Sequence, residues 1–305
     1  MGNMGNVLNK GWEFSINYNG SAAQGKFNYN VWGMFSTNKG YVREYGVRNG
    51  PVMHTNPNLN SNALLFSDAG QPWYSFMVYR TAGIFRSQDE INKYIYKNPE
   101  TGEAKLLMPE AKVGDLIFVD TNNDGVINDD DKVFAGSYTP KNTFSFGGSF
   151  DWKGFDFSFF FQGVTGNKIY NGLKQMAMNG RSDYGNLISD VLDTWDFNPE
   201  SSKYPRLGLV TGSDTNGNYT KFSDIFLEDG DYLRLKNITL GYTLPEKVCR
   251  FVGMKSGSLR VYMSVDNVCT ITGYTGVDPE VGNYGIDRGV YPVTRFFNFG
   301  VNVNF

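Results

Sequence analysis

The chain has little histidine, no run of basic residues and no long apolar stretch. Its single histidine has no partner for a metal site or a catalytic triad, and no basic run accompanies the net charge of −3. A nucleic-acid partner therefore lacks electrostatic support. No apolar stretch approaches the roughly 20 residues of a membrane-spanning helix. Residues 1–6 lack the basic start and apolar core of a signal peptide, so an exported protein would need a longer front end.

Aromatic residues and glycine, in contrast, are abundant. The 305 residues include 24 Phe, 19 Tyr and 36 Gly, a composition that favours strands and tight turns over helices. A membrane-spanning β-strand needs only about ten residues of alternating polarity, which leaves the average hydropathy modest. The composition therefore leaves open a fold that crosses a membrane with strands.

Seven segments carry apolar residues at every second position. They are Trp12–Tyr18, Phe27–Val31, Phe144–Phe150, Phe155–Phe161, Ile238–Leu244, Leu259–Val265 and Phe297–Phe305. This two-residue period predicts strands with one apolar face. A soluble β-sandwich alternates in the same way. Here, however, the intervening residues are Asn, Ser, Gly, Asp and Gln, which suit a water-filled interior, and the apolar faces are rich in Phe and Tyr, which suits contact with lipid.

The connections between these segments favour a membrane barrel over a sandwich. Short turns at 19–25 and 153–154 alternate with long excursions, one of roughly a hundred residues before Asn142 and another from Val164 to Gly230. Long excursions of this kind are uncommon inside compact soluble domains. Seven strands leave unpaired edges, which lipid does not tolerate, so we expect these strands to be part of a larger barrel. Its short turns and Phe305 should share one end.

The number of cysteines, two, is compatible with a disulfide, a metal-binding pair or two independent thiols. In the predicted barrel Cys249 lies on a short turn and Cys269 near the far end of the next strand. About 20 residues of extended chain at ~3.3 Å each separate them, far more than a disulfide spans. We therefore expect two free thiols.

Residues 120–131, D-T-N-N-D-G-V-I-N-D-D-D, have the spacing of a calcium-binding loop, with Gly125 at the sixth position and Asp131 in place of the usual Glu. The predicted ligands are the side chains of Asp120, Asn122, Asp124 and Asp131, the carbonyl of Val126, and Asn128 directly or through water. The flanking sequence is not helical. We expect a structural Ca²⁺ in a loop, because three consecutive aspartates repel one another without a cation; the alternative is an ion-free turn rich in Asx residues.

Five aromatic residues on the long excursions are candidate contacts with a substrate or a partner protein. They are Trp73, Tyr74, Trp195, Tyr204 and Tyr219. Their rings would stack on sugars or meet a lid protein, or else simply pack within folded loops. Asp193, Asp196 and Glu200 could suggest paired carboxylates for glycoside cleavage, but their segment looks like a short helix and its stop, so we expect no enzyme activity.

Seven motifs follow one another along the chain. They are N-K-G-W-E-F at 9–14, A-G-I-F-R-S-Q-D-E-I at 82–91, G-D-L-I-F-V-D-T-N-N-D-G-V-I at 114–127, K-G-F-D-F-S-F-F-F-Q-G at 153–163, Y-L-R-L-K-N-I-T-L-G-Y-T-L-P at 232–245, L-R-V-Y-M-S-V-D-N-V at 259–268 and Y-T-G-V-D-P-E at 274–280. In this order they resemble the C-terminal barrel region of SusC/RagA-family TonB-linked outer-membrane proteins of the Bacteroidota. The departures are small: Asn123 stands where the family usually has Gly, and Val268-Cys269 where Leu-Phe is common.

The resemblance implies an all-β fold in which residues 1–305 form about the last seven strands of a 22-stranded barrel of the cell outer membrane. It also implies uptake of oligosaccharides or peptides with a SusD-like surface lipoprotein as lid, energised by TonB through an N-terminal region. We expect that region, the plug domain and the TonB box to lie outside this chain. Two alternatives remain: a TonB-dependent siderophore or vitamin receptor, and a calcium-binding, glycan-binding β-rich surface module.

Overall fold

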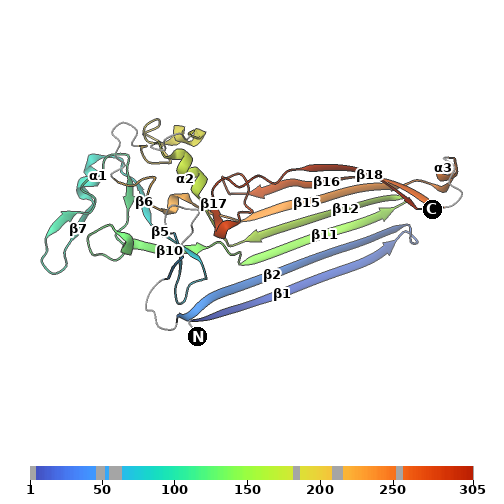
Figure 1. Ribbon diagram of the computed structural model, residues 1–305, viewed down its shortest axis with the longest axis horizontal. Helices are drawn as coiled ribbons and strands as arrows, with labels where there is room; N and C mark the ends of the chain where they lie inside the picture. Colours follow the sequence, from blue (N-terminus) through green and yellow to red (C-terminus); the bar gives the residue numbers. More distant parts are fainter. Residues whose placement is uncertain are drawn as a thin grey trace.

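The computed structural model describes residues 5–45, 52–54, 64–180, 186–207, 216–251 and 257–304. The fold is all-β. One long antiparallel sheet forms an elongated body, and the long connections fold together at one end of it (Figure 1). We call the described residues of 46–141, 166–231 and 273–295 the first, second and third excursions, and together the cap.

The long sheet has seven strands in the order β1-β2-β11-β12-β15-β16-β18, each antiparallel to its neighbours. Their bounds are Gly5–Ala22, Phe27–Tyr45, Asn142–Trp152, Phe155–Thr165, Tyr232–Thr243, Ser258–Thr272 and Phe296–Asn304. All seven predicted strands are thus confirmed, and strands that follow one another in this set lie side by side.

Several strands are longer than the alternating pattern predicted. The pattern marked Trp12–Tyr18, whereas β1 has 18 residues and β2, its hairpin partner, has 19. An apolar face is needed only where a strand contacts lipid, for about ten residues. Beyond that length the backbone ladder continues with polar residues, such as Asn9 and Lys10 opposite Gly40 and Lys39. Hydrophobic periodicity therefore located the strands but underestimated their length.

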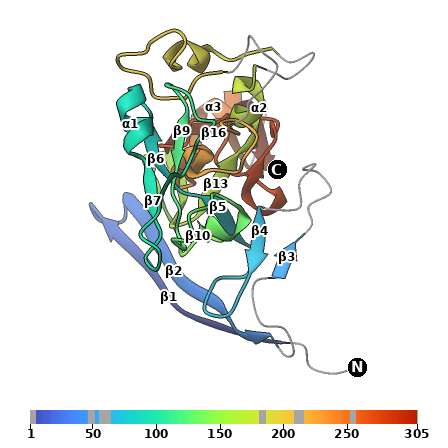
Figure 2. The same ribbon diagram turned by 90° about the vertical axis from the view of Figure 1, so that its left-hand side faces the viewer.

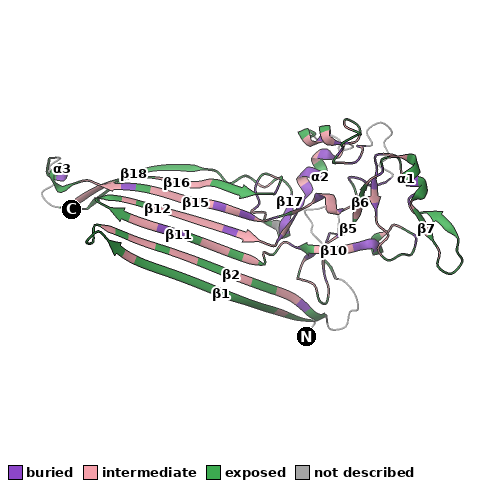
Figure 3. Ribbon diagram, turned by 180° about the vertical axis from the view of Figure 1, so that it is seen from behind, coloured by how far each residue is buried: buried purple, intermediate pink, exposed green. Residues whose placement is uncertain are grey.

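Strand register joins the separate apolar faces into one surface. Phe14 pairs with Phe35, which pairs with Phe144 on the next strand. These side chains point outward rather than into a protein core: Trp12 is 71% exposed and Phe299 is 77% exposed. Colouring by burial shows the same contrast, with most buried residues in the cap and exposed residues along the sheet (Figure 3).

The opposite face of the sheet is mainly polar and is linked by side-chain hydrogen bonds. Arg260 on β16 reaches across β15 to Asp156 on β12, with Nε 2.8 Å from Oδ1. Gly241 lies between them, and a Cβ atom there would come within 2.5 Å of both side chains. A glycine at this position is what lets the ion pair span three strands. Trp32 and Phe160 are aromatic exceptions on this face, with ring centroids 5.4 Å apart.

The short connections gather at the end of the sheet away from the cap. Lys153 and Gly154 form a two-residue hairpin with positive φ values of 49° and 88°, as tight turns of this kind require. The connection between β15 and β16 carries the short helix α3, Glu246–Phe251, and the C-terminus lies nearby (Figure 1). Cys249 is a buried residue of α3 and Cys269 is exposed on β16; both are free thiols, as expected.

One irregularity changes which side chains face inward. The pairing of β15 shifts between Leu235 and Asn237, so Lys236 is an extra residue. Strict alternation would place Arg234 on the apolar face with Ile238. The bulge reverses that parity, since one inserted residue exchanges the two faces of a strand. Arg234 is only 1% exposed and lies on the polar side.

Four small sheets make up most of the cap. Their orders are β10-β5-β4-β3, β14-β13-β17, β6-β9 and β7-β8. The strands are β3 Val52–His54, β4 Leu65–Ser67, β5 Ser75–Tyr79, β6 Thr81–Ile84, β7 Ile95–Lys97, β8 Ala104–Leu106, β9 Leu116–Phe118, β10 Lys132–Ser137, β13 Lys168–Asn171, β14 Leu227–Asp229 and β17 Ile286–Asp287. β10 leads directly towards β11, and β13 follows β12, so the cap continues from the rim of the long sheet (Figure 1).

Short helices complete the cap. They are α1 Gln88–Lys93 and α2 Gly172–Met178, with 3-10 turns η1 Asp129–Asp131, η2 Ser189–Asp193, η3 Asp224–Phe226 and η4 Asn283–Gly285. Ser87 begins α1 as an N-cap, its side chain accepting from the Glu90 N–H. Within the described ranges, no helix is both long and apolar enough to cross a membrane.

The cap has a hydrophobic interior of its own, in two clusters. The larger one joins all three excursions and includes Phe76, Tyr170, Phe226 and Ile286, each at most 1% exposed. The second packs Phe85, Ile91 and Phe118 with their neighbours beneath α1. The long excursions, which the sequence suggested to be surface loops, therefore form one packed body, seen end-on in Figure 2.

Candidate functional site

The Asp120–Asp131 loop is organised by hydrogen bonds to its own backbone. The Asp124 N–H donates to Oδ1 of Asp120 at 3.3 Å and to Oδ1 of Asn122 at 3.0 Å. The Gly125 N–H donates to the other Asp120 oxygen at 2.8 Å, and the Val126 N–H donates to Asp124 at 2.8 Å. Asp120, Asn122 and Asp124 are therefore joined by hydrogen bonds within one turn.

The closing residue of the loop is engaged differently. Asp131 is fully buried, and its two carboxylate oxygens accept from the Thr121 and Asn128 N–H groups, both at 2.8 Å. Asn128 in turn accepts from Asp130 N–H, which completes a capping box around η1. Over the described residues, no three His, Cys, Asp or Glu side chains are grouped to hold a metal. Both Asp131 oxygens are thus engaged by backbone N–H groups, and calcium binding stays a prediction.

The three consecutive aspartates are partly neutralised by the protein itself. Lys132 Nζ lies 2.9 Å from Asp129, and the Tyr79 hydroxyl donates to the same carboxylate at 2.7 Å. The hydrogen bond from Tyr79 and the neighbouring lysine lower the pKa of Asp129. Repulsion among Asp129, Asp130 and Asp131 is thus not by itself an argument for a bound cation.

Two of the five predicted aromatic contacts belong to an aromatic cluster at the rim. Tyr74 stacks on Tyr284 with ring centroids 4.6 Å apart, and Trp73 and Tyr138 meet these rings edge-on at 5.7 and 5.6 Å. Tyr74 and Tyr284 both have positive φ, at 54° and 57°. That conformation is costly for non-glycine residues and is found where the surroundings hold it in place. Trp73 and Tyr284 are 39% and 44% exposed, so this cluster offers ring surface to solvent.

The other three predicted aromatic residues pack within the cap. Tyr219 is 3% exposed and its hydroxyl donates to the Pro205 carbonyl at 2.8 Å, so its ring is not accessible in this structure. Tyr204 lies against the larger cluster beneath the Lys174 ammonium, and Trp195 is half-buried under the Arg86 guanidinium. For these residues, local packing is the better description.

Charged residues that the sequence analysis did not single out hold the excursions together. Arg206 Nε lies 2.5 Å from the fully buried Asp115, joining the second excursion to the first. Arg234 Nη2 lies 2.7 Å from Asp278 and its Nη1 3.0 Å from Glu280, tying the third excursion to β15. The sequence indicated the Arg234 ion pairs only through charged residues placed next to apolar ones, as in Y-L-R-L-K and V-D-P-E. A charge that becomes buried in such a segment requires a partner.

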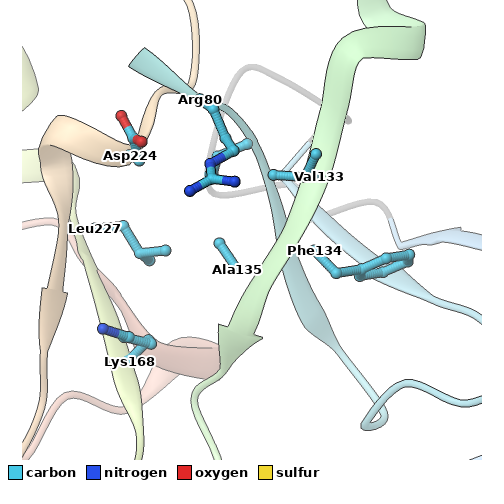
Figure 4. Close-up of a pocket in the computed structure, with 8 residues that line it drawn as sticks. Arg80, Val133, Phe134, Ala135, Lys168, Asp224 and Leu227 are labelled. Atoms are coloured by element: carbon cyan, nitrogen blue, oxygen red, sulfur yellow. The ribbon is translucent and has the colours of Figure 1, made fainter. Parts of the chain in front are cut away.

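The cap contains a pocket of about 440 Å³ between β5, β10, η3 and the first residues of β13 and β14. It is lined by Val78, Arg80, Val133, Phe134, Ala135, Lys168, Asp224 and Leu227. Figure 4 shows the Arg80 guanidinium extending into the open space, Lys168 below it, and the Phe134 ring turned away. None of the pocket-lining residues was predicted, because they come from separate parts of the sequence.

The chain is similar to TonB-dependent receptors along nearly its whole length. It is 30% identical over 316 residues to TonB-dependent receptor P26 of Formosa agariphila, covering 99% of this chain and 30% of that protein. It is 29% identical over 189 residues to the TonB-dependent receptor SusC of Bacteroides thetaiotaomicron, covering 62% of this chain and 17% of that receptor. The chain thus spans about a third or less of the relatives that it matches. These relatives are receptors and not enzymes.

The fold also matches a solved transporter structure. The structure of the RagAB peptide transporter superposes with a TM-score of 0.72 at 23% identity, covering 99% of this chain and 29% of the transporter chain. No family model matches the sequence. Together with the seven-stranded sheet, these similarities support the identification of this chain as a C-terminal barrel region of the SusC/RagA family of TonB-dependent receptors.

Proposed function

We propose that the complete protein containing this chain is an outer-membrane importer of oligosaccharides or peptides, working with a SusD-like surface lipoprotein and energised by TonB. The observation that carries this proposal is the pairing of a continuous outward apolar face with a packed cap on one end of the sheet. A wall of this kind suits lipid, and a cap on one end suits ligand capture at the mouth of a pore.

The cap supports a role in capture rather than in catalysis. The aromatic cluster of Trp73, Tyr74, Tyr138 and Tyr284 offers flat, partly exposed rings, on which sugar rings or a lid protein would pack. Trp73, Tyr74 and Tyr138 come from the first excursion and Tyr284 from the third, so the cap must be folded for the cluster to form. The RagAB similarity shows the fold alone, so it does not choose between sugar and peptide.

Deleting the complete gene tests this proposal directly. The deletion strain should lose growth on one class of oligosaccharide or peptide supplied as sole nutrient, and the intact gene supplied in trans should restore it. A strain without TonB activity should fail on the same nutrient. Normal growth of the deletion strain on every oligosaccharide and peptide tested would contradict import as the function.

A further inference from the structure

The pocket shown in Figure 4 lies where two small sheets end side by side. β10 is the edge strand of one sheet and contributes Val133, Phe134 and Ala135; β14 is the edge strand of another and contributes Leu227. β10 approaches the second sheet at Gly136, where a Cβ atom would lie 2.9 Å from the side chain of Lys168 on β13. The space therefore opens away from that contact, towards Arg80 and Asp224.

Arg80 supplies a positive charge to this space. It follows β5 directly, and since alternate residues share a strand face, it lies on the same side as Val78. Both residues line the pocket. Among the residues that the structure describes, no acceptor or carboxylate bonds the Arg80 guanidinium, whereas Arg86, Arg206 and Arg234 all have partners.

The other charged groups in the pocket are already engaged. Lys168 Nζ lies 2.7 Å from Asp229, so its charge is paired. Asp224 accepts from the Thr81 hydroxyl at 2.6 Å and from its N–H at 3.2 Å. Asp224 still contributes a negative charge at one wall, which should weaken the attraction of an anion without cancelling it.

The remaining walls are aliphatic. Val78 is fully buried beneath the pocket, and Ala135 and Leu227 are partly buried around it. A guanidinium fork matches the two oxygens of a carboxylate and binds them with charge-assisted hydrogen bonds. A cation beside an aliphatic wall thus fits a carboxylate attached to an apolar or weakly polar group.

We propose that this pocket binds a carboxylate of the imported ligand, with Arg80 on its oxygens and Val78, Ala135 and Leu227 against the adjoining carbon skeleton. The inference rests on the proposed import function, and it adds the chemical class of the ligand. The carboxylate has two sources among the proposed substrates: a uronate unit of an oligosaccharide, or the terminal carboxylate of a peptide.

Calorimetric titration of the complete purified receptor in detergent tests the pocket. The probes are tetragalacturonate with its methyl ester, and tetra-alanine with its C-terminal amide. In one of the two pairs the carboxylate form should bind and its ester or amide should not. The pair that binds shows whether the carboxylate belongs to a uronate or to a peptide. Arg80→Gln should weaken that binding about tenfold or more, since loss of a charge-assisted contact of this kind has that scale. Binding should also weaken as salt is raised.

Three further variants make the test specific. Asp224→Asn should strengthen binding of the same probe by removing a like charge. Arg80→Lys should restore part of the affinity, because the charge remains while the fork is lost. Arg250→Gln, an exposed arginine on α3 at the other end of the sheet, is the matched control and should leave binding unchanged. Retention of the heat-resistant folded band on unboiled gels checks that each variant is folded.

Two results would overturn the carboxylate pocket: equal binding of the ester or amide form, or unchanged affinity in a folded Arg80→Gln receptor. These outcomes are separable from failure of the import function, because purified receptor binds without TonB. Arg80-dependent binding together with normal growth of the deletion strain would contradict import alone. A growth defect without Arg80-dependent binding would contradict the pocket alone.

Discussion

The long sheet and the cap are built from similar residues but are stabilised by different surroundings. In the sheet, Phe and Tyr face outward, and Phe299 is 77% exposed; in the cap, Phe76 and Phe226 are fully buried. The apolar face of the sheet therefore suits contact with lipid, while the cap has an interior of its own. Loss of an aromatic side chain should therefore reduce stability strongly in the cap and weakly in the sheet, and substitutions can test this.

The largest difference is expected from removing one phenylalanine ring from each region. Phe226→Ala should destabilise the cap by about 3–5 kcal/mol, because it leaves a cavity in the larger cluster. Phe297→Ala, on the outward face of β18, should cost far less, because lipid or detergent fills the space. Limited proteolysis of the cap and heat-modified gel mobility of the barrel measure the two effects separately. Equal losses would contradict the comparison.

A charge placed on the sheet should show which face contacts lipid. Leu240 is exposed on the apolar face of β15, and Leu240→Arg should cost about 2–4 kcal/mol if it lies near the bilayer midplane. Its neighbour Thr239 points to the polar face, so Thr239→Arg is the matched control and should be tolerated. Folding yield into lipid vesicles over a urea series provides the measurement. A larger penalty at Thr239 would mean that the two faces are assigned the wrong way round.

Calcium should have the smallest effect, and one confined to the cap. If Ca²⁺ binds the Asp120–Asp131 loop, chelation should increase protease cleavage near that loop while leaving the heat-modified mobility of the barrel unchanged. Asp124→Asn should reduce the protection that calcium gives, because it removes one predicted charged ligand. Identical cleavage with calcium and with chelator would support the ion-free loop, held by Asp131 and its capping box.

The sequence predicted the sheet better than the cap for a physical reason. In each strand, outward Phe and Tyr alternate with Asn, Ser and Gly on the other face. This local alternation let the periodicity locate all seven strands. It failed locally at Lys236, where a bulge reverses the two faces and places Arg234 inside. A bulge has no strong signal in the sequence, because it depends on how neighbouring strands pair.

The candidate site was predicted only in part, for a related reason. Asp120, Asn122 and Asp124 are joined by local hydrogen bonds, and their role as calcium ligands stays a prediction. The position of Asp131 instead depends on η1, where its carboxylate accepts from the Asn128 N–H in a capping box. Trp73 and Tyr74 were selected from the sequence. Their cluster is completed by Tyr138, far along the same excursion, and by Tyr284 of the third excursion.

By itself, then, the sequence determined the seven strands, their apolar faces, the two free thiols and the resemblance to SusC/RagA receptors. These features depend on local alternation and on motifs within one segment. The tertiary structure decided that the long excursions form one packed cap, that Arg234 and Asp115 are buried anchors, and that Arg80 extends into a pocket. Such features arise only when distant segments pack together, because burial and charge pairing depend on neighbours in space rather than along the chain.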